Sequence, residues 1–319
     1  MTTVRPEKLL LLDTASLYYR AFYGIPDSIT APDGTPVNAV RGLLDMIARL
    51  VTEHRPSRLV ACWDDDWRPA FRVDAIPTYK AHRVAQALPG ADDVEDVPDL
   101  LAPQVPVIVD VLAALGIARV GAPGYEADDV IGTLVARERE RPAADRTPID
   151  IITGDRDMFQ LVDDDAHVRV LYTQRGIKNL EVVDQARLAE RYAVSSGQAY
   201  ADMAVLRGDA SDGLPGVAGI GEKTAVALLA RYGDLAGILA ARDAADPGMT
   251  PGQRTRLADA TDYLAVAPRV VRVAPDAPVG DVQDTLPRTP ADPDELAGLS
   301  TRWGLTSSVS RILTALSLD

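Results

Sequence analysis

Cysteine and histidine are scarce in this chain. It contains one cysteine, Cys62, and three histidines, His54, His82 and His167, which lie far apart. One cysteine cannot form an internal disulfide, and these spacings exclude an ordinary zinc site, whose ligands occur in close pairs. Cys62 is therefore predicted to be a small buried residue of a strand.

Long hydrophobic runs are absent as well. The first run, Leu9 to Leu12, ends at once in Asp13, and the run from Val105 to Ala118 is interrupted by Asp110. A membrane span needs roughly 20 apolar residues, and a secretory signal needs a longer apolar segment near its start. We therefore expect a soluble, intracellular protein. Its 319 residues suffice for one large domain or two smaller ones.

Positive charge is in deficit. The chain has 33 basic and 47 acidic side chains, a formal net charge of −14, and no Lys or Arg between Val84 and Ala118. Such a balance disfavours a nucleic-acid partner unless part of the negative charge is gathered in one place and neutralised by bound cations. The positions of the acids therefore decide which class of function is possible.

Short apolar runs that end on Asp alternate with helical patterns. The runs are Leu9 to Leu12, Leu59 to Trp63, and Ile149 to Thr153. Apolar residues at three- and four-residue spacing predict helices at three places: Ala39 to Thr52, Pro103 to Leu115, and Ala127 to Glu140. This alternation predicts βαβ units and a parallel sheet, in which ligands gather at the carboxyl ends of the strands.

The second half of the chain has a different character. Val168 to Tyr172 and Ile177 to Val182 predict a hairpin that closes the α/β part. Helices are predicted beyond it at Ser196 to Leu206, Glu222 to Tyr232, and Asp234 to Arg242, followed by a loop-rich stretch from Ala274 to Asp294. The predicted organisation is an α/β core over 8–183 and a helical subdomain over 184–319.

Nine acids stand at predicted strand ends, helix starts or tight turns: Asp13, Asp64, Glu126, Asp128, Asp129, Asp155, Asp157, Asp209 and Asp212. Helix capping explains one of the three acids between 126 and 129, but not the rest. Clustered carboxylates repel one another unless cations compensate them, and ligand sets made of oxygen alone suit Mg²⁺ or Mn²⁺. Two such ions about 4 Å apart can clamp a phosphodiester for hydrolysis by water.

Several segments together carry a resemblance to a known family. They are Leu9 to Asp13 with Tyr19 to Phe22, Tyr79-Lys80, Gly124 to Asp129, Thr153 to Asp157, and Gly208 to Thr224. In this order they resemble the bacterial 5′-nuclease family, which includes the nuclease domain of DNA polymerase I and stand-alone flap endonucleases. The resemblance runs from about residue 8 to the C-terminus.

The resemblance implies a fold and a ligand set. The expected fold is a mostly parallel sheet flanked by helices, with a helical arch at about 80–106 and a DNA-binding helical subdomain containing a helix-hairpin-helix element. A first metal would use Asp13, Asp64, Glu126, Asp128 and Asp129, and a second Asp155, Asp157, Asp209 and Asp212, some through water. Because the spacing after Asp64 is one residue longer than in the family, Asp65 is an alternative ligand.

The segment from Leu214 to Gly221 resembles the hairpin of that element. Its glycines let backbone N–H groups approach a phosphate without reading a base. The expected DNA contacts are Gly216, Gly219, Gly221, Lys223 and Thr224, and the family's hairpin often carries a monovalent cation such as K⁺. The alternatives are a plain glycine-rich turn and a phosphate-loop NTPase, which Glu222 disfavours by separating Gly221 from Lys223.

Basic residues near the expected metals complete the set. Arg72, Lys80 and Arg83 are expected to stabilise the charge that develops on the scissile phosphate, although each can also be a solvated surface charge. Arg20 is expected to reach the same phosphate. Tyr79 is expected either to stack on an unpaired base or to lie in the core.

The sequence thus predicts a 5′-3′ exonuclease and flap endonuclease that acts on DNA, and on RNA in hybrids, at a 5′ end, flap or nick. Primer removal and DNA repair would follow, in the cytoplasm at the nucleoid, by a monomer that cooperates with a separate DNA polymerase. Two alternatives are a ribonuclease on a related acidic fold and an inactive structure-specific DNA-binding protein. The 209–224 hairpin disfavours the first, and the intact acid set disfavours the second.

Overall fold

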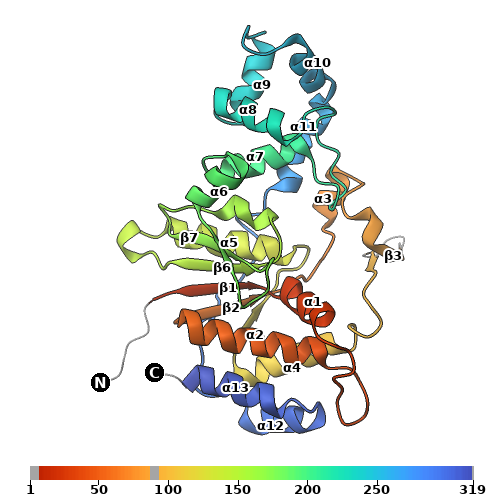
Figure 1. The fold of residues 1–319 in the computed structure, drawn as a ribbon, viewed down its shortest axis with the longest axis vertical. Helices are drawn as coiled ribbons and strands as arrows, with labels where there is room; N and C mark the ends of the chain where they lie inside the picture. Colours follow the sequence, from red (N-terminus) through yellow and green to blue (C-terminus); the bar gives the residue numbers. More distant parts are fainter. Residues whose placement is uncertain (1–6, 87–92, 318–319) are drawn as a thin grey trace.

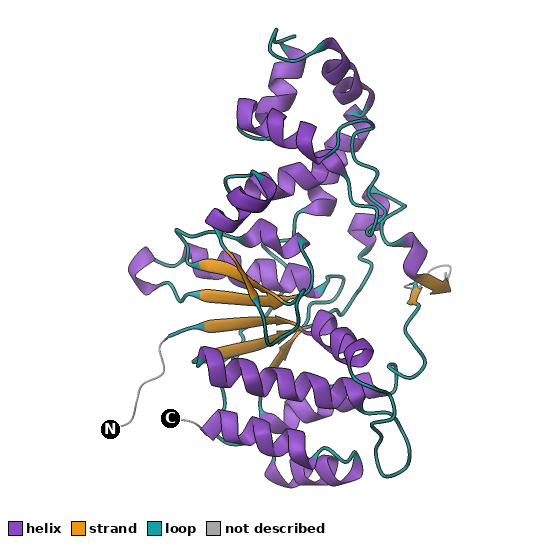
Figure 2. Ribbon diagram, in the orientation of Figure 1, coloured by secondary structure: helices purple, strands orange, loops and turns teal. Residues whose placement is uncertain are grey.

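A six-stranded sheet lies at the centre of the computed structural model, which describes residues 7–86 and 93–317 (Figures 1 and 2). Along the sheet, the strands are β5 (Ala118–Val120), β2 (Arg58–Cys62), β1 (Leu9–Asp13), β6 (Ile149–Thr153), β7 (Val168–Tyr172) and β8 (Glu181–Val183). Neighbours from β5 to β7 are parallel, and β8 is antiparallel to β7. The predicted parallel sheet is confirmed.

The central strand β1 is buried on both faces. Leu9 and Leu11 belong to the hydrophobic core on one side of the sheet, and Leu10 and Leu12 to the core on the other. A strand covered on both faces needs a continuous apolar run, which is why Leu9 to Leu12 shows no alternation with polar residues. Cys62 is buried in β2, as predicted.

Helices cover both faces of the sheet. On one face lie α2 (Asn38–His54) and α4 (Gln104–Leu115), and on the other α5 (Ala127–Glu140). A separate group of helices stands above the sheet in Figure 1: α6 (Gln185–Tyr192), α7 (Gly197–Arg207), α8 (Glu222–Tyr232), α9 (Leu235–Asp243), α10 (Pro251–Asp259) and α11 (Thr261–Val271). These form the helical subdomain. Three of them, α7 to α9, begin and end within one residue of the prediction.

The C-terminal end of the predicted subdomain was placed wrongly. After α11 the chain runs back along the core, where the N–H of Leu59 donates to the carbonyl of Asp284. The last helices, α12 (Pro293–Arg302) and α13 (Thr306–Ser317), then pack beneath α4 and α2 (Figure 1). Their apolar side chains, among them Leu299 and Ile312, are buried in the core on that face of the sheet, so 293–317 belongs with the α/β part.

The arch expected at about 80–106 is not helical in the part that the structure describes. A short 3₁₀ turn (Ala81–Arg83) leads into β3 (Val84–Gln86), which pairs antiparallel with β4 (Val94–Glu95); turns follow until α4 begins. Residues 87–92, which belong to the expected arch, lie outside the described residues. Pro98 and Pro103 interrupt the stretch before α4, and its acids have no lysine or arginine at helical spacing to compensate them.

The predicted hairpin exists, but its second strand begins at Glu181 because Ile177 and Leu180 pack against the core beneath β7 instead of pairing with it. Within residues 7–86 and 93–317, no single helix has the length and apolar character of a membrane span. Only the bent pair of α8 and α9 passes such a test, by length and composition alone.

Candidate active site

Acids from separate elements meet at the carboxyl edge of the sheet. Asp13 is the last residue of β1, Asp64 follows β2, and Asp155 follows β6. With Glu126 and Asp128 from the start of α5, they line one pocket of about 550 Å³. Because parallel strands end at the same edge, residues far apart in the sequence converge here.

Local folding fixes each of these acids. Asp13 also caps α1 (Thr14–Gly24), accepting the N–H of Ser16 at 3.2 Å. Asp64 accepts the N–H of Ala127 at 2.8 Å and so holds the start of α5 against β2. The hydroxyl of Thr153 donates to Asp13 at 2.6 Å and accepts the N–H of Asp155 at 2.8 Å, which ties the ends of β1 and β6 together.

The negative charge in the pocket is not balanced. Burial, together with the nearby Asp64 and Asp155, raises the pKa of Asp13 to about 7. Burial and the charge of Asp13 likewise raise the pKa of Asp128 well above its usual range. Among the described residues, the Asp128 carboxylate has no hydrogen-bond or ion-pair partner. Lys80, which lines the same pocket, offsets only part of this negative charge.

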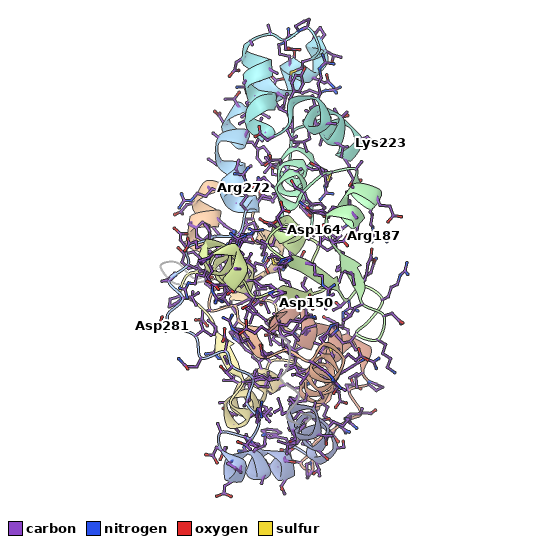
Figure 3. The ribbon with its side chains drawn as sticks, turned by 90° about the vertical axis from the view of Figure 1, so that its left-hand side faces the viewer. Asp150, Asp164, Arg187, Lys223, Arg272 and Asp281 are labelled. Carbon is purple, nitrogen blue, oxygen red and sulfur yellow. The ribbon has the colours of Figure 1, made fainter. Side chains whose placement is uncertain are left out.

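The opposite edge of the same sheet provides a contrast. Asp150, near the amino end of β6, is as buried as Asp13, and Figure 3 shows it from that side. It is paired with Lys8 at 3.1 Å and with Arg169 at 2.6 Å. Although burial opposes the change, the hydrogen bond from Arg169 and the charge of Lys8 lower the pKa of Asp150. The chain pairs this buried acid with its own cations at one edge, whereas Asp13 and Asp128 at the other edge have no basic partner within the described residues.

Three further acids lie next to the pocket. Burial raises the pKa of Asp157, and the nearby Asp155, Asp212 and Asp209 raise it further. Asp209 and Leu214 pair across a tight turn, and the carbonyl of Asp212 accepts the N–H of Lys80 at 3.0 Å. All nine predicted acids thus lie in one region of the molecule, but they are not equivalent.

Asp129 is the exception. It is fully buried, and its two carboxylate oxygens lie 2.6 and 2.7 Å from the guanidinium of Arg72. Asp129 also accepts the N–H of Glu126 at 3.2 Å, which is its half of a capping box in which Glu126 is the N-cap residue of α5. Asp128 and Asp129 are adjacent on a helix and point about 100° apart, so only Asp128 faces the pocket. The predictions of Asp129 as a ligand and of Arg72 as a phosphate contact are corrected on this geometry.

Tyr79 is also a core residue. Its ring is buried, and its hydroxyl donates to Glu126 at 2.8 Å, so it is not available for base stacking.

Asp64 and Asp65, the two candidate ligands after β2, differ in orientation. Asp65 lies 3.6 Å from Arg119, whereas Asp64 faces Glu126 and Lys80 across the pocket, which favours Asp64.

Lys80 and Arg83 lie beside two of the predicted acids. Lys80 forms an ion pair with Glu126, and Arg83 lies 3.3 Å from Asp212. Burial alone would lower the pKa of Lys80, but Glu126 outweighs it, so the pKa is raised well above its usual range. Arg20 lies beside Gly154, and its buried Nε has no hydrogen-bond partner within the described part of the chain.

The pocket wall contains residues that the motifs did not single out as ligands or DNA contacts. Tyr18, Tyr19 and Trp63 form an aromatic side, with the rings of Tyr18 and Tyr19 stacked at 5.3 Å. Glu95 of β4 lines the same pocket, and its charge acts on Tyr19. Tyr19 of this wall and Thr153, which binds Asp13, lie within the segments that resemble the family, so the sequence contains a signal for both. The position of Glu95 follows from the pairing of β4 with β3, for which the sequence has no local signal.

The predicted hairpin lies at the start of α8. Gly216 and Gly219 have φ of +65° and +76°, and Gly221 is the N-cap of the helix. A side chain at Gly216 would collide with the carbonyl of Arg207, so glycine is needed for the close turn. Lys223 is exposed in the first turn of α8 (Figure 3), and Thr224 is half-buried.

Within the described residues, no group of three or more carboxylate, histidine or cysteine side chains is already arranged at metal-binding distances. The donor set nevertheless fits Mg²⁺ or Mn²⁺. It consists of carboxylate oxygens, Lys80 offsets only part of its negative charge, and such ions typically keep several waters and take only one or two direct carboxylates. The pocket lacks nitrogen and sulfur ligands for zinc among its described lining residues.

Family models match nearly all of the chain. The 5′-3′ exonuclease N-terminal resolvase-like domain matches residues 8–193, and the 5′-3′ exonuclease C-terminal SAM fold matches residues 195–294. The chain belongs to the 5′-3′ exonuclease family. The resemblance found in the sequence is confirmed, and membership of this family makes the protein a nuclease.

Relatives within the family agree with this assignment. A 5′-3′ exonuclease of Streptomyces coelicolor is 62% identical, covering 96% of this chain and 99% of that protein. A 5′-3′ exonuclease of Mycobacterium tuberculosis is 54% identical, with 97% of both chains covered. DNA polymerase I of Mycobacterium bovis is 36% identical over 90% of this chain, but only 29% of that protein is covered.

Solved structures share the fold at low sequence identity. The T5 D15 protein co-crystallised with metal ions has a TM-score of 0.64 at 16% identity and covers 97% of this chain and 100% of its own. The catalytic core of Rad2 in complex with DNA has a TM-score of 0.57 at 17% identity, with 98% of this chain and 93% of its own covered. The predicted mostly parallel sheet with flanking helices and the C-terminal helical subdomain are therefore confirmed.

The unbalanced charge has a measurable consequence in the metal-free protein. The folded-state pKa of Asp13, about 7, lies above its ordinary value of 3.8, so the destabilisation by Asp13 grows as the pH rises from about 4 to about 7 and levels off above that. Lowering the pH from 8.5 to 6.5 in EDTA should stabilise the fold by about 1 kcal/mol, or a rise in Tm of about 1 °C. Thermal melts at both pH values check this.

Asp13→Asn is the matched variant for these melts. All other ionisable groups remain in it, so the difference between the two proteins reports Asp13 together with its effect on the neighbouring Asp128. The variant should melt at a higher temperature than wild type at pH 8.5 and show a smaller pH dependence. Equal pH dependence in both proteins would contradict the assignment.

Proposed function

We propose that this protein hydrolyses DNA phosphodiesters near a 5′ end, flap or nick, as a 5′-3′ exonuclease and flap endonuclease with two bound Mg²⁺ or Mn²⁺ ions. The single observation that carries the proposal is the shared pocket of Asp13, Asp64, Glu126, Asp128 and Asp155, whose negative charge the chain itself does not balance. RNA in a DNA–RNA hybrid is a further expected substrate.

The residues divide into two groups around the proposed ions. Asp13, Asp64, Glu126 and Asp128 would hold one ion, and Asp155, Asp157, Asp209 and Asp212 the other, in part through water. Ions bound there would supply an activated water and offset the charge that develops on the phosphorus.

Side chains around the acids would bind and orient the DNA. Lys80 and Arg83 provide positive charge opposite the carboxylates for the scissile phosphate. The stacked rings of Tyr18 and Tyr19 offer an apolar face beside the pocket on which an unpaired base can stack. Arg20, whose Nε lacks a partner in the described structure, lies beside Gly154, which lines the pocket.

The hairpin before α8 would hold the duplex without reading its sequence. Its exposed backbone around Gly219 and Gly221, the N-terminus of α8 and the side chain of Lys223 suit a backbone phosphate. A K⁺ ion would bind main-chain carbonyls of this hairpin. Arg256 already donates to the Gly219 carbonyl at 3.2 Å, so the ion would rely on the other carbonyls.

The proposed role is the removal of replication primers and repair flaps in the cytoplasm, at the nucleoid. The protein would act as a monomer and alongside a separate DNA polymerase. The proposed partner and location follow from the proposed substrate.

The central experiment uses a 5′-labelled flap duplex, a nicked duplex, and a matched single-stranded RNA. With Mg²⁺ or Mn²⁺ the flap should be cut near its junction, leaving a 5′-phosphate on the downstream product, and EDTA should abolish the reaction. Cleavage that persists in EDTA would reject metal-dependent hydrolysis. Faster cutting of the RNA would favour a ribonuclease, and metal-independent flap binding without cutting would favour an inactive binding protein.

A further inference from the structure

The guanidinium of Arg72 lies behind the acidic pocket and joins three parts of the molecule. Arg72 belongs to the short helix α3 (Ala70–Ala75) and is 2% exposed. Its Nη1 donates to Glu126 at 2.6 Å, and its Nε donates to the carbonyl of Val270 at 3.0 Å. Glu126 lines the pocket, whereas Val270 lies in the last turn of α11, in the helical subdomain.

Asp129 fixes Arg72 in this place. The two side chains form a bidentate pair, at 2.6 Å and 2.7 Å, in a site that excludes water. Asp129 is held in turn by the N–H of Ala274 at 2.7 Å, in the chain that leaves α11. A bidentate pair with a further hydrogen bond allows little rotation, so the guanidinium has a defined direction.

Glu126 is held from two sides. Arg72 and the hydroxyl of Tyr79 both donate to its Oε2, at 2.6 Å and 2.8 Å, and the Tyr79 hydroxyl also lies 3.1 Å from Oε1. On the pocket side, Oε1 is paired with Lys80, which lines the pocket as well. The buried partners behind the carboxylate fix its direction, and the oxygen in front faces the pocket, which is the arrangement expected for a group held ready to bind an ion.

We propose that Arg72 is a positioning residue: it aims the Glu126 carboxylate into the pocket and makes that aim depend on where the end of α11 lies. The inference rests on the proposed function, because it assigns Glu126 to metal binding. Arg72 itself does not touch the substrate or the ion. The helical subdomain, through Val270 and Ala274, thereby helps to set the geometry of the acidic pocket.

A purely structural ion pair would behave differently. Removing one partner of a buried pair lowers stability in either case. Only a positioning role also weakens metal binding by the folded protein, and loss of an outer partner of a ligand typically costs 10- to 100-fold in metal affinity. The affinity for the metal, measured on folded protein, therefore separates the two.

The experiment titrates Mn²⁺ into wild type, Arg72→Lys, Arg72→Gln and Asp129→Asn by calorimetry without DNA, and measures flap cleavage against Mn²⁺ concentration. Arg72→Gln should bind Mn²⁺ about tenfold or more weakly and need correspondingly more Mn²⁺ for cleavage. Arg72→Lys keeps the charge but not the bidentate geometry. Compared with Arg72→Gln, it should therefore recover more of the lost stability than of the lost Mn²⁺ affinity. The affinity for flap DNA in Ca²⁺-free EDTA buffer should change less than about threefold, since Arg72 is buried.

Arg58→Gln is the control. Arg58 pairs with Glu138 and Asp284 at the opposite edge of the sheet, so its loss should reduce Tm without changing Mn²⁺ affinity. If Arg72→Gln does not fold, the comparison is made with Arg72→Lys, at a temperature where its melt shows folded protein. Wild-type Mn²⁺ affinity in a folded Arg72 variant, or an equal loss in Arg58→Gln, would overturn the inference. Absence of Mn²⁺ binding and cleavage in the wild type would instead overturn the proposed function.

Discussion

Replacing Asp128 with Asn should reduce flap cleavage at saturating Mg²⁺ by about a thousandfold or more, because bound metal supplies several kcal/mol of transition-state stabilisation. Asp128 is a pocket acid with no hydrogen-bond or ion-pair partner in the described structure, and it faces Asp13 and Asp155. The amide keeps the shape of the side chain but removes the charge that would bind an ion. Single-turnover cleavage of a labelled flap measures the loss.

The same variant should keep its affinity for DNA. Removing one negative charge beside a phosphate-binding site weakens repulsion, so the Kd for a flap in EDTA should stay the same or fall slightly. Because Asp128 is destabilised by its neighbours, the variant should also melt no lower than wild type without metal. Retention of more than about a tenth of wild-type cleavage would remove Asp128 from the set of ligands.

Asp150→Asn is the matched control for that substitution. Asp150 is a buried acid on the same sheet, but Lys8 and Arg169 compensate it at the edge away from the pocket. Its replacement leaves two cations without their partner and should lower Tm, whereas the cleavage rate of the folded protein should not change. Opposite effects of two Asp→Asn changes on stability and activity would separate a functional acid from a structural one.

The location of the site could be predicted from the sequence because one rule governs it. Asp13, Asp64 and Asp155 each follow an apolar run, and parallel strands deliver their carboxyl ends to one edge of the sheet. The rule needs only the strand direction and no knowledge of side-chain contacts. It is also why the large separation of these residues in the sequence did not matter.

The roles of individual residues were harder to predict, since they depend on which way a side chain points. Asp128 and Asp129 are identical neighbours, yet helical geometry sends one into the pocket and the other towards Arg72. That division could have been anticipated from the angle between adjacent helical residues. The partner of Asp129 could not, because Arg72 and Ala274 reach it from 57 and 145 residues away.

The errors at 80–106 and 293–317 have a different cause. The pattern within α12 and α13 predicts amphipathic helices but not the surface that they cover, which is supplied by α2 and α4. The arch was expected from the family resemblance, and the described residues form a small two-stranded sheet and turns instead. In both segments the local sequence is compatible with more than one arrangement, and long-range packing selects among them.

Lys80 is the residue whose backbone most clearly indicates a functional constraint. Its φ is +46°, in the left-handed region, which costs a non-glycine residue of order 1 kcal/mol. The surrounding contacts hold it there: the N–H of Lys80 donates to Asp212 at 3.0 Å, and the hydroxyl of Thr78 donates to the carbonyl of Gly213 at 2.7 Å. These hydrogen bonds hold the loop of Thr78 and Lys80 against the loop of Asp212 and Gly213, so that the ammonium group of Lys80 lies in the acidic pocket.

Replacing Lys80 with Ala should therefore lower kcat for flap cleavage by about 100- to 1,000-fold, as expected when one preorganised donor to a developing oxyanion is lost. KM and the Kd for DNA should change by less than about threefold, because a single phosphate contact contributes little to the binding of a long duplex. Arg83→Ala, which removes a more exposed cation beside Asp212, should have a smaller effect on kcat. If Lys80→Ala instead weakens DNA binding and keeps kcat at saturating DNA, Lys80 attracts the substrate but does not stabilise the transition state.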